Sequence, residues 1–157
     1  MATIYEGTLN PPPGRFVLVA ARFNKDVVDK LVAGAREGFQ RHGVAEDAVD
    51  LVWVPGSFEI PLVAQRLASS GKYAAVVGLG AVIKGETDHY EYVCESAARG
   101  VMEAGLATGV PVIFGVLTCQ TEDLALARAG GKDGNKGFDA ALAAIEMVNL
   151  LKQLPGK

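Results

Sequence analysis

The segment GETDHYEYVCE, residues 85–95, places carboxyl, hydroxyl and imidazole groups next to one another. His89 is one of only two histidines in the chain, and the pattern places it in the first turn of a helix. Because imidazole changes charge near neutral pH, His89 is a candidate proton shuttle. The positive end of the helix dipole should disfavour the imidazolium and leave a neutral base available. A histidine at a helix start can instead simply pack locally, but the glycine- and hydroxyl-rich loop before it favours the chemical role.

The residues just before this helix could hold an anion. Residues 85–87, Gly-Glu-Thr, precede the helix start, where free backbone amides and the helix dipole favour a group such as phosphate. Thr87 and Asp88 are also ordinary capping residues, and Asp88 and Glu91 have the spacing of a capping box. Arg128, near the end of a short predicted helix, could bind a phosphate or could stabilise the helix C-terminus. The sequence leaves both roles of Arg128 open.

Signatures of nucleotide cofactors are incomplete in this chain. The string GLGAVIKG offers Gly78 and Gly80, but Ile83 stands where the dinucleotide fingerprint requires a third glycine. Gly80 and Gly85 have the spacing of a phosphate loop, but Glu86 replaces the required lysine. No His, Cys and carboxylate cluster has metal-ligand spacing either. We therefore expect neither a nucleotide cofactor nor a metal.

The elements that must position these residues alternate along the chain. Apolar runs of strand length are followed by amphipathic helical patterns, which predicts an α/β fold, a parallel sheet with helices on both faces in three layers. Strands that are apolar throughout fit such a sheet because both of its faces are buried. The expected strands cover residues 15–21, 49–54, 73–79 and 110–118, and the expected helices cover residues 25–42, 57–71, 89–107, 122–130 and 138–154.

Local signals predict how some of these elements begin and end. Asn24 and Thr121 are placed to cap two helices, and Gly43 is placed to end the first. Residues 3–6, TIYE, could form a short strand, but NPPPG separates them from the core because proline removes backbone donors and fixes φ. We therefore expect residues 1–14 to form an N-terminal arm whose strand pairs with a neighbouring subunit.

The predicted fold also indicates where a ligand binds. In open parallel sheets, ligands bind beyond the carboxyl ends of the strands. Phe23 and Phe58 fall in loops there, where an aromatic side chain gains little unless something covers it. Ser57 and Glu59 could bind the polar edges of a ring while Phe58 stacks on it, although Ser57 could equally be a helix cap. We expect a pocket formed by residues 21–24, 55–59, 80–89 and 118–121.

Length and composition limit the class of protein. A chain of 157 residues predicts one domain, residues 1–157. Hydrophobic residues make up 50% and charged residues 21%, a balance that indicates apolar surface buried against other copies. The net charge of −3 argues against a nucleic-acid partner. The longest apolar stretch, residues 73–83, falls short of the ~20 residues that span a bilayer, and the first residues lack a signal-peptide pattern. We therefore expect no membrane partner and a cytoplasmic location, in which Cys94 and Cys119 stay reduced.

Six strings occur in order along nearly the whole chain: ARFN, PGSFEIP, GAVIKGETDHYEYV, PVIFGVLT, RAG and GNKG. In these strings the chain resembles the 6,7-dimethyl-8-ribityllumazine synthase family. The resemblance implies a flavodoxin-like four-stranded parallel sheet and a transferase that uses neither a metal nor an organic cofactor. It further implies that 5-amino-6-(D-ribitylamino)uracil and 3,4-dihydroxy-2-butanone 4-phosphate condense to 6,7-dimethyl-8-ribityllumazine, phosphate and water. This is the penultimate step of riboflavin biosynthesis.

The resemblance also assigns roles to individual residues. His89 would be the proton donor, and Phe23 would stack on the pyrimidine ring. Lys136 of GNKG would lie nearby, and Cys119 departs from the threonine that is common in the family. Ser57, Phe58 and Glu59 would contact the ribityl chain and the ring, and the backbone of Ala81, Val82 and Ile83 would line the ring. Glu86 and Thr87 would bind the phosphate. A neighbouring subunit would supply Phe114 for the pyrimidine and Arg128 for the phosphate.

The resemblance implies assembly as well. The family forms pentameric rings, and some members build an icosahedral shell from them. The short GNKG connection here favours the shell. Two other classes of function stay open: a flavin- or nucleotide-binding module without turnover, and a shell-forming structural protein that lacks catalysis. His89, Arg128 and Phe23, all present, favour the enzyme.

Overall fold

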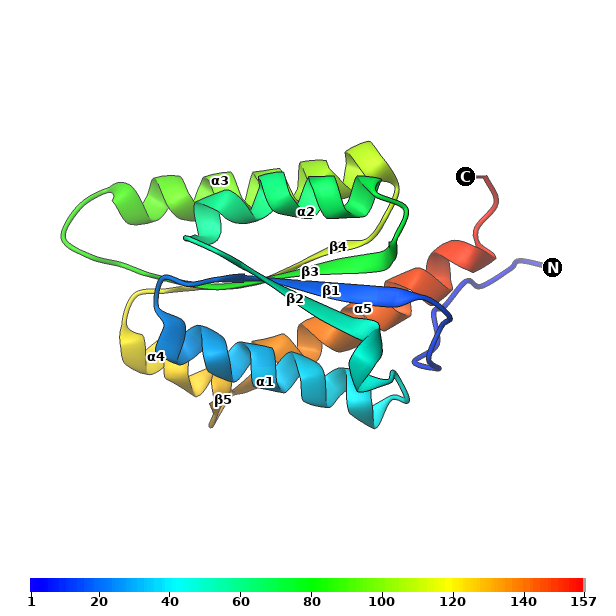
Figure 1. The fold of residues 1–157 in the computed structure, drawn as a ribbon, viewed down its shortest axis with the longest axis horizontal. Coiled ribbons are helices and arrows are strands. Elements are labelled where there is room, and N and C mark those ends of the chain that lie inside the picture. The colour runs from blue at the N-terminus through cyan, green and yellow to red at the C-terminus, as the bar shows by residue number, and fades with distance from the viewer. Residues whose placement is uncertain (157) are drawn as a thin grey trace.

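The computed structural model describes residues 1–156 and contains one parallel sheet. Its strand order is β2-β1-β3-β4, so that the edges of the sheet are β2 and β4. This arrangement confirms the predicted α/β class and the three layers that Figure 1 shows. The strands are β1 (Arg15–Ala21), β2 (Val49–Val54), β3 (Tyr73–Ile83) and β4 (Val112–Cys119).

Helices cover both faces of this sheet (Figure 1). On one face lie α2 (Ile60–Ser69) and α3 (His89–Thr108), and on the other lie α1 (Lys25–Arg41), α4 (Glu122–Ala127) and α5 (Lys136–Gln153). None of the helices in residues 1–156 is long and apolar enough to cross a membrane.

The apolar strands divide their side chains between two cores. Successive side chains of a strand point to opposite faces, so alternate residues of β1 enter different cores. Phe16, Leu18 and Ala20 pack with α1 and α5, whereas Val17 and Val19 pack with α2 and α3. Because helices bury both faces, these strands are apolar at most positions, as predicted, with Arg15 and Asp50 as polar exceptions at their amino ends.

The structure differs from the predicted elements at the end of β3 and in three other segments. We expected β3 to stop at residue 79, but it continues to Ile83 because its last residues pair with β4 up to Cys119. The predicted helix over residues 57–71 is a 3₁₀ turn, η2 (Ser57–Glu59), followed by α2. A second 3₁₀ turn, η1 (Glu46–Ala48), precedes β2. The loop expected after α4 holds a small hairpin, β5 (Ala129–Gly131) and β6 (Gly134–Asn135).

The predicted helix ends are partly confirmed. The Thr121 side chain accepts a hydrogen bond from the amide of Leu124, which confirms it as the cap of α4. Gly43 has φ of 84°, as expected for a residue that ends a helix in the left-handed region. A cap that we did not predict is Asn135, whose side chain accepts hydrogen bonds from Gly137 N and Phe138 N at the start of α5.

Two predicted caps are wrong. Asn24 precedes α1 but adopts a left-handed conformation, φ 59° and ψ 44°, and its side chain donates to Ala81 O instead. Asp88 precedes α3 with helical backbone angles, φ −73° and ψ −2°, whereas a capping residue usually needs an extended backbone. The first amide of α3, that of His89, bonds to Thr87 Oγ1 at 3.4 Å instead, so the expected capping box with Glu91 is also wrong.

The N-terminal arm lies against α5. Residues 3–6 form no strand within this single chain, and the expected pairing of the arm with a neighbouring subunit stays a prediction. The Asn149 side chain donates to Thr8 O at 2.9 Å and to Asn10 O at 2.8 Å, and the Gln153 side chain donates to Glu6 O at 2.8 Å. Figure 1 shows the N-terminus beside the C-terminal end of α5. The arm is thus held to its own domain from residue 6 onward.

Candidate active site

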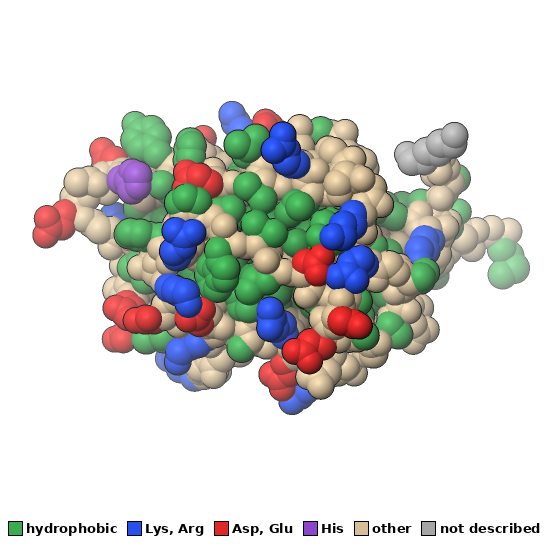
Figure 2. Space-filling view, in the orientation of Figure 1, with side chains coloured by type: hydrophobic (Ala, Val, Ile, Leu, Met, Phe, Trp, Pro, Cys, Tyr) green, Lys and Arg blue, Asp and Glu red, His purple; other side chains and the backbone are tan. Residues whose placement is uncertain are grey.

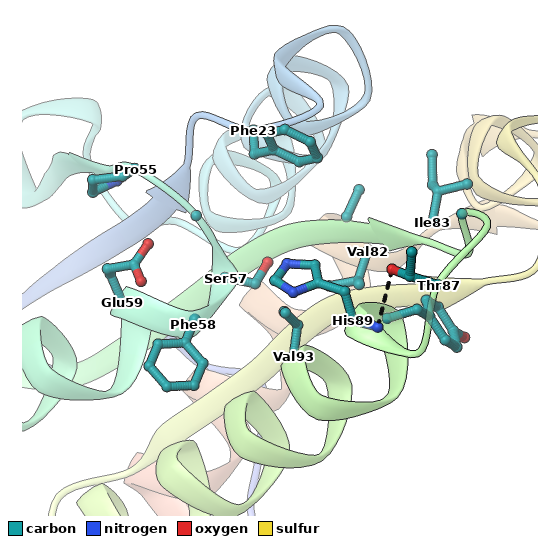
Figure 3. A pocket seen from close by; sticks show the side chains of 14 residues that line it. Phe23, Pro55, Ser57, Phe58, Glu59, Val82, Ile83, Thr87, His89 and Val93 are labelled. Atoms are coloured by element: carbon teal, nitrogen blue, oxygen red, sulfur yellow. Dashed lines mark hydrogen bonds between the residues drawn. The ribbon is translucent and has the colours of Figure 1, made fainter.

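A pocket of about 640 Å³ lies beyond the carboxyl ends of β1, β2 and β3. Three loops and the first turns of α3 form it, and their side chains converge in Figure 3. Its position at the carboxyl ends of the strands is the one that we predicted for a parallel sheet, but the predicted segment after β4, residues 118–121, is absent from its wall. The lining residues are Phe23, Pro55, Gly56, Ser57, Phe58, Glu59, Ala81, Val82, Ile83, Gly85, Thr87, His89, Tyr90 and Val93.

The loop after β1 presents Phe23 to this pocket. The amide of Arg22 donates to Val54 O at 2.8 Å, and the amide of Phe23 donates to Pro55 O at 3.0 Å. The Asn24 side chain ties the same loop to the end of β3 through Ala81 O, at 2.8 Å. The Phe23 ring itself is 73% exposed. The backbone is therefore anchored on both sides while the aromatic face stays open to a ligand.

The turn η2 contributes two side chains of opposite character. Ser57 is 5% exposed, and Figure 3 shows its hydroxyl directed toward the His89 ring. Phe58, the next residue, is 57% exposed. Gly56 precedes the turn with an extended backbone, so Ser57 lies inside η2 and does not cap it. The alternative role that we considered for Ser57, a helix cap, is therefore wrong.

The start of α3 presents His89. Its backbone amide donates a hydrogen bond to the Thr87 hydroxyl. Its ring lies across the pocket from η2 in Figure 3. Val93, one turn further along, lies on the same face of the helix and lines the pocket beneath the ring. Tyr90 also lines the pocket, and burial raises the pKa of its phenol, which is therefore neutral at pH 7.

Our reading of the sequence missed two lining residues, Tyr90 and Val93 of α3. Both occupy apolar positions of a helix, which usually indicate packing against a core. Val93 lies four residues after His89, a spacing that places both on one face of the helix and that could have identified Val93. Tyr90 follows His89 directly, and its spacing gives no such signal.

Glu86 is a predicted site residue that lies outside this pocket's wall. It is exposed in the loop between β3 and α3, whereas its neighbours Gly85 and Thr87 line the cavity. The loop thus brings the start of α3 and its free amides to the pocket, and the Glu86 side chain projects elsewhere in this single chain.

A second pocket, of about 380 Å³, lies beside the edge strand β4 and shares no lining residue with the first. It contains Phe114 and Arg128, the two residues that we expected a neighbouring subunit to supply, together with Lys136. Arg128 Nη1 donates to Leu124 O at 3.0 Å and lies 3.6 Å from a carboxylate oxygen of Asp133. Arg128 therefore does stabilise the end of α4, while its side chain remains at the pocket.

The cysteines contribute no reactive thiolate. Cys119 lies in the wall of the second pocket, and burial raises the pKa of its thiol. Burial likewise raises the pKa of the Cys94 thiol on α3. Both groups are therefore neutral thiols at pH 7. Among residues 1–156, no three His, Cys, Asp or Glu side chains gather in a way that could hold a metal ion.

The arrangement can bind a planar ring and move protons. The first pocket combines exposed aromatic faces with a hydroxyl, a carboxylate and an imidazole. A comparison with known families is consistent with this chemistry. A family model described as 6,7-dimethyl-8-ribityllumazine synthase matches residues 13–152 of the 157-residue chain.

Proposed function

Because the chain belongs to the 6,7-dimethyl-8-ribityllumazine synthase family, whose members are transferases of riboflavin biosynthesis, we propose its substrates. They are 5-amino-6-(D-ribitylamino)uracil and 3,4-dihydroxy-2-butanone 4-phosphate, and the products are 6,7-dimethyl-8-ribityllumazine, inorganic phosphate and water. One observation carries the proposal: Phe23 of the loop after β1, Ser57 of η2 and His89 of α3 line one pocket together.

The reaction needs several proton transfers. The 5-amino group attacks the ketone carbonyl, and water leaves as the imine forms. Phosphate is then eliminated, and the ribitylamino nitrogen closes the ring with loss of a second water. His89 lies in the pocket wall and can give or take a proton at these steps, which typically contributes about 10²–10⁴-fold to a rate. Holding two substrates in a reactive orientation can lower the barrier by about 7–11 kcal/mol in ideal cases.

The pyrimidine is assigned to the aromatic side of the pocket. The exposed face of Phe23 would stack on its ring, and the polar groups of Ser57 and Glu59 would bind the ribityl chain and ring edge beside Phe58. The backbone of the end of β3 would line the ring at Ala81, Val82 and Ile83.

The phosphate is assigned to the start of α3. Free amides at a helix N-terminus attract anions, and Thr87 adds a hydroxyl there. Glu86 belongs to the same loop and would hold its backbone in place. His89, in the first turn of α3, would then stand between the phosphate and the pyrimidine.

We further propose that the complete site is formed by two subunits. Phe114 and Arg128 line a pocket separate from that of His89, so one chain alone does not bring them to the reacting groups. If the second pocket of a neighbouring copy faces the first pocket, Phe114 closes the pyrimidine site and Arg128 reaches the phosphate. Lys136 would lie beside them.

A homo-oligomer built from pentameric rings would supply this arrangement, and the short GNKG connection favours a further icosahedral shell. Two surface features support self-association. Hydrophobic side chains gather over the edge strand β2 on the face shown in Figure 2, and edge strands readily pair with another chain. Ile4 and Tyr5 of the arm are 87% and 46% exposed. Sedimentation velocity tests the assembly: an active monomer would contradict the shared site, and a dominant pentamer would contradict the shell.

The test of the proposed reaction is to mix the two substrates with the purified chain, with and without a chelator. We expect lumazine absorbance and phosphate to appear at equal rates, to require both substrates and to be unaffected by the chelator. Tight binding of ribityllumazine without turnover would instead indicate a binding module and contradict the proposal.

A further inference from the structure

Two glycines of β3, Gly78 and Gly80, point to the same face of the sheet because they are two residues apart. A Cβ added at Gly78 would lie 2.9 Å from Ile60 Cγ2, inside the core. A Cβ added at Gly80 would overlap Ser57 Oγ. The next atoms it would meet are Ala21 Cβ at 3.4 Å and Ile60 Cδ1 at 3.5 Å, which are ordinary contacts. The space beside Gly80 is therefore filled by one hydroxyl oxygen.

This hydroxyl has no partner in the protein that would explain its position. Ser57 is the single polar residue counted as buried among residues 1–156, at 5% exposure. Its side chain makes no hydrogen bond to another described residue. Its oxygen is nevertheless not one of the described polar atoms that are both shielded from solvent and unbonded. A buried polar group without a partner costs free energy unless a ligand or water satisfies it. Figure 3 shows the hydroxyl directed toward the pocket interior.

We propose that Gly80 is a positioning residue for substrate binding: its lack of a side chain leaves the space in which the Ser57 hydroxyl can point into the pocket and bond the ribityl chain of the pyrimidine. The inference rests on the proposed function, which assigns Ser57 to that substrate. It also gives a reason for the second glycine of the string GLGAVIKG, which is no nucleotide fingerprint.

The geometry predicts that an alanine at position 80 disturbs binding more than folding. Gly80 is absent from the residues with positive φ, so alanine fits its backbone. The oxygen it would overlap ends a short side chain that can turn about one bond. The hydroxyl would therefore leave its present position while the sheet stays intact. Gly78→Ala is the matched control, since it presses on the Ile60 methyl group in the core.

The experiment is a double-mutant cycle with 6,7-dimethyl-8-ribityllumazine as the probe, its affinity measured by fluorescence titration. We expect Gly80→Ala and Ser57→Ala each to weaken binding by about two- to tenfold, as loss of one hydrogen bond predicts. If Gly80 acts through Ser57, the double variant should bind no worse than Ser57→Ala alone. In steady-state assays Gly80→Ala should raise KM for the pyrimidine, while KM for the butanone phosphate stays unchanged. Gly78→Ala should lower the melting temperature without changing KM.

Three outcomes overturn the inference. The first is wild-type affinity for the probe in Gly80→Ala. The second is a loss of affinity in the double variant equal to the product of the losses in the two single variants. The third is a melting temperature of the double variant below that of Gly80→Ala. If Gly80→Ala alone fails to fold, the inference requires the double variant to fold, because removing Oγ removes the overlap. Failure of the wild type to bind the probe or to turn over would contradict the proposed function, and this result is separate from the cycle.

Discussion

The two ends of the sheet use their polar residues in different ways. At the amino end, Asp50 uses both carboxylate oxygens within the protein: Oδ1 accepts from Arg15 Nη2 at 2.6 Å, and Oδ2 accepts from Tyr73 OH at 2.6 Å. Lys72 Nζ lies 3.7 Å from the same carboxylate. At the carboxyl end, the hydroxyl of Ser57 and the exposed ring of His89 face a cavity instead.

The difference distinguishes a structural cluster from a binding site. Both ends hold charged and hydroxyl groups, so composition alone does not separate them. At the amino end Arg15 and Tyr73 both bond the Asp50 carboxylate, although Arg15 Nε is buried without a hydrogen-bond partner among the described residues. Substitutions there should change stability. At the carboxyl end aromatic rings are exposed and polar groups face open space, and substitutions should change activity. The predictions that follow test this contrast, beginning with the largest expected effect.

Replacing His89 with alanine should lower turnover by about 10²–10⁴-fold, the usual contribution of a general acid or base. Affinity for ribityllumazine should change little, because the ring moves protons and does not anchor the pyrimidine. Single-turnover rates and fluorescence titration measure the two effects. His42→Ala is the matched control, since His42 bonds Gly38 O at the far end of α1. Wild-type turnover in His89→Ala would remove His89 from the mechanism.

Replacing Arg128 with alanine should weaken binding of the phosphorylated substrate by about 1.5–3 kcal/mol, the usual range for a hydrogen bond to a charged group. Affinity for the pyrimidine should stay near the wild-type value. Initial rates at varied concentrations of each substrate measure this, with Arg41→Ala, which breaks an exposed pair with Glu37, as the control.

Mixing the two impaired variants tests whether Arg128 acts across an interface. Subunits carrying His89→Ala and subunits carrying Arg128→Ala should regain activity when they assemble together, because some sites then receive both wild-type residues. No recovery after verified co-assembly would count against a shared site.

Asn24 holds the Phe23 loop in a left-handed conformation, so its replacement should affect both stability and activity. Asn24→Ala loses the bond to Ala81 O and strains the backbone, which should lower the free energy of unfolding by roughly 1–3 kcal/mol. Asn24→Gly keeps the conformation and should lose only roughly 0.5–1.5 kcal/mol. Both variants should bind the pyrimidine more weakly. Denaturant unfolding and ligand titration measure the effects, and equal losses of stability would contradict the role of the left-handed backbone.

Asp50→Asn should change the pH dependence of stability but not turnover. Hydrogen bonds from Tyr73, and then from Arg15, lower the pKa of Asp50 below its usual 3.8. The ionised Asp50 carboxylate therefore stabilises the folded protein at pH values above its usual pKa, and this stabilisation is lost as the pH falls through the lowered pKa. The difference in melting temperature between wild type and variant should be largest near neutral pH and should shrink below about pH 4. A constant difference across this range would contradict the assignment.

The sequence predicts the layers well because their cause is local. Runs that are apolar at every position indicate strands buried on both faces, and periodic apolar positions indicate helices. The end of β3 was missed because Gly78 and Gly80 resemble a break. Pairing with β4, which the sequence does not reveal, carries the strand to Ile83.

The site was predictable where a residue type stands out from its surroundings. A phenylalanine gains little in an exposed loop, and a histidine at a helix start beside glycine and hydroxyl residues is unusual. Phe23, Phe58 and His89 could therefore be identified. Tyr90 and Val93 resemble core positions and were missed, and the interplay of Gly80 and Ser57 depends on a contact between segments far apart in sequence. The arm strand over residues 3–6 stays a prediction, because it was expected to pair with a neighbouring subunit and the structure contains one chain.

Hydrogen exchange with and without bound ribityllumazine tests the central contrast most directly. We predict protection of amides at the carboxyl end of the sheet, in residues 22–24, 55–59 and 84–90. Residues 114–119 and 128–136 should be protected as well if a neighbouring copy completes the site. Amides near Arg15, Asp50 and Tyr73 should exchange unchanged. Protection at the amino end, or none at the carboxyl end, would contradict the account.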